Sequence, residues 1–124
     1  IVDQARDGTG CAIVNSDDES GIQRLNQEAA KALAAGRRAG FEISEGRAMT
    51  WITKNPAKSL GILDQTGTLD TGKDADVVIW SGNPFSIYTK AEQVYIDGAL
   101  AFDKATNFMP HTDFDLGVKE WEDK

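Results

Sequence analysis

Hydrophobic and polar positions change their spacing along the chain, and the first clear pattern is a short apolar run. Residues 1–10 are polar and end in Asp7-Gly-Thr-Gly10, which is typical of a loop. The run Cys11-Ala-Ile-Val14 lies between Gly10 and the polar cluster Asn15-Ser-Asp-Asp-Glu19. It is too short for a helix and predicts a short buried strand. We expect Cys11 to be a small buried side chain in this strand.

Helical spacing follows the polar cluster. The pattern predicts a helix over residues 20–36, with Ser20 or Asp18 as its N-cap and Gly36 as its C-terminal stop. Its alanine-rich second half has high intrinsic helix propensity. The apolar residues expected on one face of this helix are Ile22, Leu25, Ala29, Ala32 and Leu33.

A second helix is predicted to begin near Ser44, with Ala48, Trp51 and Ile52 on one side. Asn55-Pro56 interrupts it, because proline disfavours helical geometry in the residue before it. Pro56 can open a further short helix at its first position, with Asn55 as the cap. We expect Leu60 to pack this helix and Gly61 to end it.

The pattern becomes strand-like after Gly61. Asp76-Val-Val-Ile-Trp80 is rich in residues that favour strands. Asp97-Gly98 separates Gln93-Val-Tyr-Ile96 from Ala99-Leu-Ala-Phe102, which predicts a hairpin with a two-residue type I′ turn. Residues 104–124 are polar, and we expect a surface tail with Phe108, Phe114 and Trp121 as anchors.

Composition restricts the function classes. The chain has 124 residues, of which 40% are hydrophobic, so it fits one ordinary domain. A net charge of −7 argues against non-specific binding to nucleic acid or to an anionic membrane. No apolar run approaches the ~20 residues of a membrane span, so we expect a soluble protein, cytoplasmic or periplasmic.

One cysteine excludes an intramolecular disulfide. The chain starts at Ile1, so the lack of a signal peptide says nothing about export.

The candidate chemistry lies in Asn15-Ser-Asp-Asp-Glu19, between the predicted strand and the first predicted helix. In an α/β barrel this is the carboxyl end of a strand, where catalytic groups lie. A carboxylate there can bind a metal ion or act as a general base. From the spacing alone, helix capping by Asp18, Glu19 and Ser20 is the simpler interpretation. Both roles can hold, with Asp17 functional.

An EF-hand calcium loop does not fit, because Gly21 is one position late. We expect His111 to be a surface side chain, because a metal site needs several such ligands.

Three segments, in this order, resemble the carboxyl-terminal end of the amidohydrolase superfamily, near its imidazolonepropionase-like members. The first is Asn15-Ser-Asp-Asp-Glu19 with Gln23-Arg-Leu-Asn-Gln-Glu28 just after it. The second is Trp51-Ile-Thr-Lys-Asn-Pro-Ala-Lys-Ser-Leu-Gly61. The third, and the most specific, is Gly67-Thr-Leu-Asp-Thr-Gly-Lys-Asp-Ala-Asp-Val-Val-Ile-Trp-Ser-Gly-Asn-Pro84, continued by Val94-Tyr-Ile-Asp-Gly98.

The resemblance implies an α+β fragment. It would contain the last βα unit of a TIM-type barrel, then helices, then the carboxyl-terminal strands of a small β-sandwich. Residues 1–62 would end the metal-dependent hydrolase barrel, with Cys11–Asn15 as its eighth strand. Residues 63–104 would belong to the composite sandwich, and residues 105–124 would form the surface tail. The glycine-rich segment around Gly72 and Asp76 would be structural.

The resemblance also implies that Asp17 is the family's last metal ligand and accepts a proton from the hydrolytic water. Relatives commonly have His-Ser-Asp where this chain has Asn15-Ser16-Asp17, which puts local substrate contacts in doubt. The family's other ligands are absent, and one carboxylate cannot hold zinc tightly. We therefore expect a divalent metal, zinc, in the complete hydrolase of amide-type C–N bonds, and an inactive, metal-free fragment here.

Two other interpretations stay open. The chain can be a non-catalytic binding module, or a small subunit that completes a barrel with another polypeptide. The expected partner is the rest of the amidohydrolase chain. Apolar surface around Ile13, Val14, Leu25 and Trp51 also predicts self-association.

Overall fold

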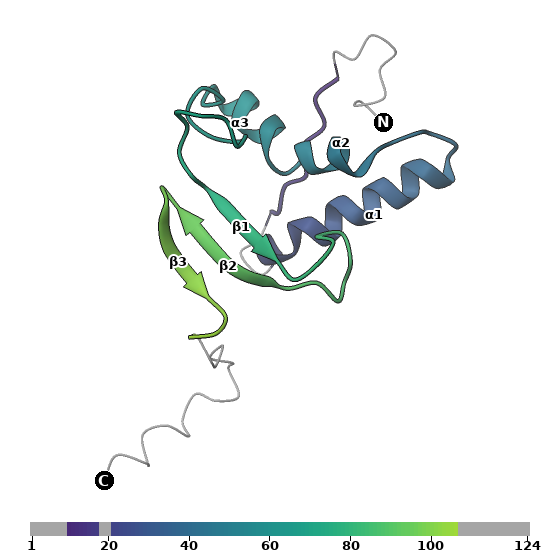
Figure 1. Cartoon of the computed structure of the whole chain (residues 1–124). Coiled ribbons are helices and arrows are strands. Elements are labelled where there is room, and N and C mark those ends of the chain that lie inside the picture. Colours follow the sequence, from purple (N-terminus) through teal and green to yellow (C-terminus); the bar gives the residue numbers. More distant parts are fainter. Residues whose placement is uncertain (1–9, 18–20, 107–124) are drawn as a thin grey trace.

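The computed structural model describes residues 10–17 and 21–106, which form three helices beside a small sheet (Figure 1). The helices are α1 (Leu25–Arg38), α2 (Glu45–Thr50) and α3 (Lys54–Leu60), and a 3₁₀ turn, η2 (Ile22–Arg24), precedes α1. The strands are β1 (Val77–Trp80), β2 (Ala91–Ile96) and β3 (Ala99–Asp103). The α+β class expected from the sequence is therefore confirmed. The expected domain boundaries stay a prediction.

Helix α1 differs from its prediction at both ends. The residue before η2 is Gly21 and the residue before α1 is Arg24, and neither makes a side-chain cap hydrogen bond. The predicted caps, Ser20 and Asp18, lie outside the described residues. The predicted stop at Gly36 is wrong, because the helix continues to Arg38. The true end is a Schellman motif, in which Gly40 has a φ of 87° and the Phe41 N–H donates to the Gly36 carbonyl over 3.1 Å.

Gly36 has a packing role inside α1. A Cβ built on this residue would lie 2.6 Å from Ile43 Cδ1, so glycine makes room for the buried Ile43 side chain. The buried face of α1 includes Ala29 and Leu33, as predicted. Ile22 and Ala32 are exposed, which contradicts their predicted place on that face.

The next two helices follow their predicted order. Ser44 caps α2, and its Oγ accepts a hydrogen bond from the Arg47 N–H over 3.1 Å. Helix α3 begins at Lys54, two residues before the predicted start at Pro56. Pro56 is therefore the third helical residue, which is tolerated because the first-turn N–H groups have no intrahelical acceptor.

One of the two predictions for the end of α3 is confirmed and the other is wrong. Gly61 ends the helix in the left-handed region, with a φ of 75°, as predicted. Leu60 does not pack the helix, since 73% of its surface is exposed. Its burial was wrongly predicted because the side chain lies on the outer side of this short helix.

The sheet is antiparallel, with strand order β1-β2-β3. The predicted hairpin joins β2 to β3, and its turn residues Asp97 and Gly98 have φ values of 51° and 77°. Positive φ at both central positions is what a type I′ turn requires. A sheet of three strands leaves β1 and β3 as edges within the described part of the chain.

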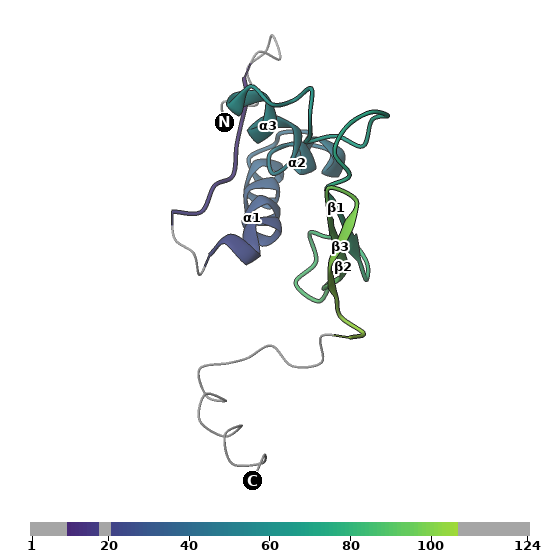
Figure 2. The same ribbon diagram turned by 90° about the vertical axis from the view of Figure 1, so that its left-hand side faces the viewer.

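The core lies among the helices, and the sheet forms a separate layer. Figure 2 shows the sheet edge-on, with α1 between it and the segment 10–17. The core consists of Ala29, Leu33, Ile43, Ala48 and Trp51, with Ala12, Val14, Ile52 and Phe85 packed against it. Phe85 comes from the loop between β1 and β2, so this loop joins the two layers. In the same contact, Asn26 Nδ2 donates to the Pro84 carbonyl over 2.6 Å.

Within residues 10–17 and 21–106, none of the helices has the length and apolar character needed to cross a bilayer.

Candidate functional site

The segment that leads to Asp17 is extended but is not part of a sheet. The strand predicted over Cys11–Val14 is therefore wrong for this chain. A strand needs a neighbouring strand to bond with, and the described residues supply none at this place. Exposure nevertheless alternates, with Ala12, Val14 and Ser16 half-buried. This period of two is the side-chain pattern of extended backbone.

Two hydrogen bonds attach this segment to the junction between α2 and α3. The Val14 N–H donates to the Trp51 carbonyl over 3.1 Å. The Asn55 side-chain Nδ2 donates to the Ala12 carbonyl over 2.8 Å. Asn55 was interpreted from the sequence as a helix cap. The structure instead gives its side chain a partner in the segment 10–17, which the sequence around Asn55 does not indicate.

Cys11, Ile13, Asn15 and Asp17 alternate with the inward side chains and are exposed. The predicted burial of Cys11 is thus wrong, because the side chain alternates outward and no strand in the described ranges covers it. Asp17 lies at the end of the segment, ahead of η2, where its carboxylate faces solvent. Asn15 Nδ2 donates to Asp17 Oδ1 over 3.4 Å. Asp18, Glu19, Ser20 and His111 lie outside the described residues.

Asp17 is not joined by other metal-ligating side chains in the described ranges. In residues 10–17 and 21–106, no three His, Cys, Asp or Glu side chains gather closely enough to hold a metal ion. A tightly bound zinc ion requires three or four protein ligands. The residues in view therefore supply one carboxylate and do not fit a complete metal centre.

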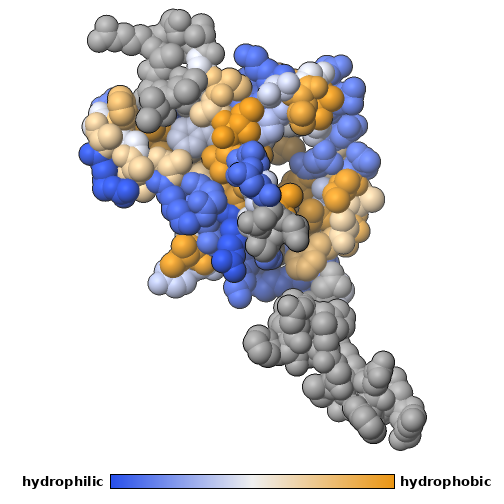
Figure 3. Space-filling view, turned by 180° about the vertical axis from the view of Figure 1, so that it is seen from behind, coloured by the Kyte–Doolittle hydropathy of each residue, from blue (hydrophilic) through white to orange (hydrophobic). Residues whose placement is uncertain are grey.

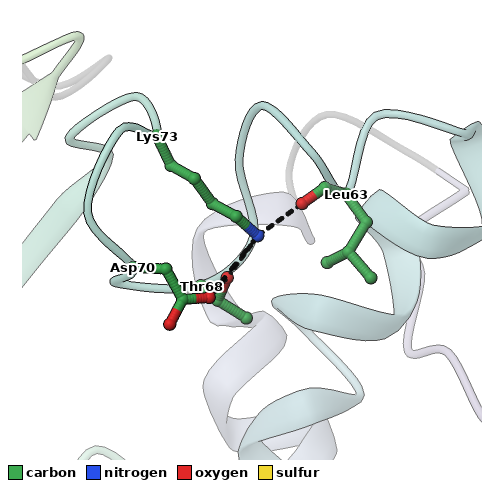
Figure 4. A network of polar contacts seen from close by, with 4 residues as sticks. All are labelled: Leu63, Thr68, Asp70 and Lys73. Atoms are coloured by element: carbon green, nitrogen blue, oxygen red, sulfur yellow. Dashed lines mark hydrogen bonds and ion pairs between the residues drawn. The ribbon is translucent and has the colours of Figure 1, made fainter.

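The glycine-rich segment after α3 is held together by Lys73 (Figure 4). The Lys73 ammonium donates to the Leu63 carbonyl and, over 2.6 Å, to Thr68 Oγ1. It also lies 3.6 Å from Asp70 Oδ2. Lys73 is half-buried, so these partners replace much of its hydration. The contacts close the loop between residues 63 and 73, which agrees with the structural role expected for this segment.

Asp76 ties the same loop to the tip of the β2–β3 hairpin. Its Oδ2 accepts from Thr66 Oγ1 over 2.7 Å, and its Oδ1 accepts from the Asp97 N–H over 3.1 Å. These donors stabilise the ionised carboxylate, so the Thr66 hydroxyl first and the Asp97 N–H second lower the pKa of Asp76. The Thr68 hydroxyl lowers the pKa of Asp70 in the same way.

An apolar hollow of about 420 Å³ lies beside the segment 10–17. Figure 3 looks onto this face, and hydrophobic side chains gather along it. Ile13 and Phe41 are exposed at the hollow, whereas Trp51, expected to contribute open surface, is only 4% exposed. The residues that line the hollow are Ala12, Ile13, Val14, Ala32, Ala35, Gly36, Ala39, Phe41, Ile43 and Trp51.

Comparison with known proteins connects these features to one group of enzymes. The model of the amidohydrolase family matches residues 4–111. An imidazolonepropionase of Brucella suis is 46% identical over 55 residues, which are 44% of this chain and 12% of that protein. An imidazolonepropionase of Mesorhizobium japonicum is 40% identical over 55 residues, again 44% of this chain and 12% of that protein.

A solved structure gives a similar result. The crystal structure of an amidohydrolase from Thermotoga maritima matches with a TM-score of 0.55 and 41% sequence identity. The match covers 63% of this chain and 19% of that chain. This chain therefore matches a small part of the length of each of these relatives.

Proposed function

Because this chain belongs to the amidohydrolase family, we propose that it is the carboxyl-terminal part of a metal-dependent hydrolase of amide-type C–N bonds. In this proposal Asp17 is the contribution of the chain to the active site. Members of the family are generally metal-dependent, and the match extends over most of the chain. We expect the chain by itself to be inactive, because in residues 10–17 and 21–106 no group of three metal-ligating side chains includes Asp17.

The position of Asp17 is the observation that supports this role. It ends an extended segment that begins with the apolar residues 11–14, and helical structure in the described residues begins again at Ile22. Its carboxylate is exposed and accepts a hydrogen bond from Asn15. A carboxylate in such a place can accept a proton from an attacking water. The other groups that the reaction requires would come from the rest of the enzyme.

We propose that the segment 10–17 forms part of a barrel in the complete enzyme. Its side chains alternate as in a strand, and its inner side packs on the helical core. The apolar hollow beside it would then be filled by the preceding part of the barrel. The relatives support this view, because the match covers only 12% of one imidazolonepropionase and 19% of the Thermotoga maritima enzyme.

The proposed context of the sheet is a composite sandwich. The sheet has three strands in the described residues, whereas an ordinary sheet has about four to six. Large apolar side chains on these strands are exposed: Val78, Ile79, Ile96 and Leu100. A second layer of strands from elsewhere in the enzyme would cover those on one face of the sheet, since neighbours such as Val78 and Ile79 point to opposite faces. Apolar strand residues are stabilised when a second layer removes them from water.

A second candidate function is that of a separate subunit which docks onto a larger, histidine-bearing chain. The hollow of about 420 Å³ favours it, because a continuous apolar surface of this kind marks an interaction site. Affinity purification of the tagged chain from its own cells tests this candidate. Recovery of the chain alone, at 124 residues and without a larger partner, would contradict it.

The experiment for Asp17 uses the complete protein encoded by the reading frame. Asp17→Asn should lower kcat for hydrolysis of an amide or imide substrate by about 10²–10⁴-fold, since a general base contributes that much. Asp64→Asn is the matched control, because Asp64 is an exposed carboxylate in the loop after α3. Equal activity of the Asp17 and Asp64 variants would contradict the proposal.

The inactivity of the 124-residue chain has its own test. Zinc titration should give no tight stoichiometric binding, and the same sample should not hydrolyse the substrate. Tight 1:1 binding of zinc together with turnover would show that this chain holds a complete site.

A further inference from the structure

Asn15 and Asp17 are a pair of side chains on the same side of an extended backbone. In such a backbone, residues two positions apart point the same way and lie roughly 6.6 Å apart. Both side chains are exposed, and Ser16 between them is half-buried. Asn15 Nδ2 donates to Asp17 Oδ1 over 3.4 Å, so the amide reaches along the chain to one of the two carboxylate oxygens.

The backbone of this segment is fixed independently of the pair. The bonds from Asn55 to the Ala12 carbonyl and from Val14 to the Trp51 carbonyl attach it to the core. These backbone contacts do not restrict the rotation of the Asp17 side chain about its own bonds. The Asn15 amide restricts it, because the hydrogen bond selects one orientation of the carboxylate.

We propose that Asn15 is a positioning residue, whose side-chain amide orients the carboxylate of Asp17 for its reaction. The inference rests on the proposed function of Asp17. A neutral amide suits this task, because it donates a hydrogen bond without adding a charge beside the carboxylate. A lysine or arginine in the same place would form an ion pair and make the carboxylate a weaker base. The hydrogen bond is made to Oδ1 of the carboxylate.

The first test measures activity in the complete protein. Asn15→Leu keeps the shape of the side chain and removes the donor, so kcat should fall about tenfold with KM nearly unchanged. Asn15→His should recover most of the loss, because the imidazole Nδ1 is as many bonds from the backbone as the amide nitrogen. Circular dichroism checks that each variant is folded.

Two results would overturn the proposal. One is wild-type kcat in Asn15→Leu, and the other is an equal loss in Asn15→Leu and Asn15→His. Failure of the proposed function gives a different result, because Asp17→Asn would then keep full activity. If Asp17→Asn loses activity and Asn15→Leu does not, only the positioning role is wrong.

The second test does not depend on activity and uses the 124-residue chain. In ¹⁵N-labelled protein, Asp17→Ala removes the acceptor and should shift the side-chain amide resonances of Asn15. The side-chain amide of Gln65, exposed in the loop after α3, is the control and should not shift. Unchanged Asn15 resonances would show that the amide does not hold Asp17 in solution.

Discussion

Two glycines in the loop between α3 and β1 have the same backbone conformation and very different surroundings. Gly67 has a φ of 88° and Gly72 a φ of 89°. A Cβ on Gly67 would lie 2.5 Å from Ala57 Cβ and 3.2 Å from the Thr53 carbonyl oxygen. A Cβ on Gly72 would meet nothing within 4 Å. Alanine substitutions at these two positions therefore separate backbone strain from steric overlap.

The magnitude follows from the two terms. Each substitution places a Cβ in the left-handed region, which costs about 1–2 kcal/mol. Each also reduces the freedom of the unfolded chain equally, so that effect cancels in the comparison. Gly67→Ala has an additional overlap with Ala57 Cβ, which is fixed to the backbone of α3 and cannot rotate away. Overpacking of this kind costs about 1–3 kcal/mol.

The assay is urea unfolding followed by tryptophan fluorescence, to which the buried Trp51 contributes, and by far-ultraviolet circular dichroism. We expect Gly67→Ala to lose about 3 kcal/mol of unfolding free energy and Gly72→Ala about 1 kcal/mol. With a typical urea slope, the difference separates the two midpoints by about 1 M. Equal losses would refute the reasoning, because they would show that α3 yields to the added methyl group without cost.

Two further predictions concern polar contacts. Asn26→Ala should lower the unfolding free energy by about 1–3 kcal/mol, because it removes the buried amide that donates to the Pro84 carbonyl. The urea midpoint measures this loss, and an unchanged midpoint would contradict the prediction. The pKa of Asp76 is lowered below its ordinary value of 3.8, so its stabilising contribution is present above that pH and is lost as pH falls through the lower folded value. Wild type should therefore lose stability below about pH 4 more steeply than Asp76→Asn, and identical pH dependence of their urea midpoints would show that the contacts of Asp76 carry no such linkage.

Local chemistry made several elements predictable from the sequence. The Asp97-Gly98 turn, the Ser44 cap and the Gly61 stop each depend on the conformation of one or two residues. The strand Val77–Trp80 was also recognisable, because its side chains favour strands whatever lies beside them. These features need no knowledge of distant contacts.

The predictions of helix ends fail where contacts between residues that are distant in the sequence determine the local structure. The predicted stop at Gly36 is wrong because Gly40 takes the left-handed conformation that ends α1, while Gly36 makes room for Ile43, a contact that the residues next to Gly36 do not indicate. Pro56 lies inside α3 because the helix begins at Lys54, where Thr53 takes the cap position without a side-chain bond. Threonine often caps helices, but the Thr53 hydroxyl donates to the Met49 carbonyl over 2.9 Å, so its residue type alone does not show where α3 begins.

The candidate site depends on both kinds of information. The spacing alone favoured helix capping for the acidic cluster, and only the resemblance to a family singled out Asp17. The structure adds that the segment before Asp17 keeps the side-chain alternation of a strand although no strand pairs with it. Contacts from Trp51 and Asn55 maintain that alternation, since they fix the carbonyl of Ala12 and the N–H of Val14. The path of the backbone that leads to Asp17 is thus set by the helices behind it, whereas the orientation of the Asp17 carboxylate depends on the bond from Asn15.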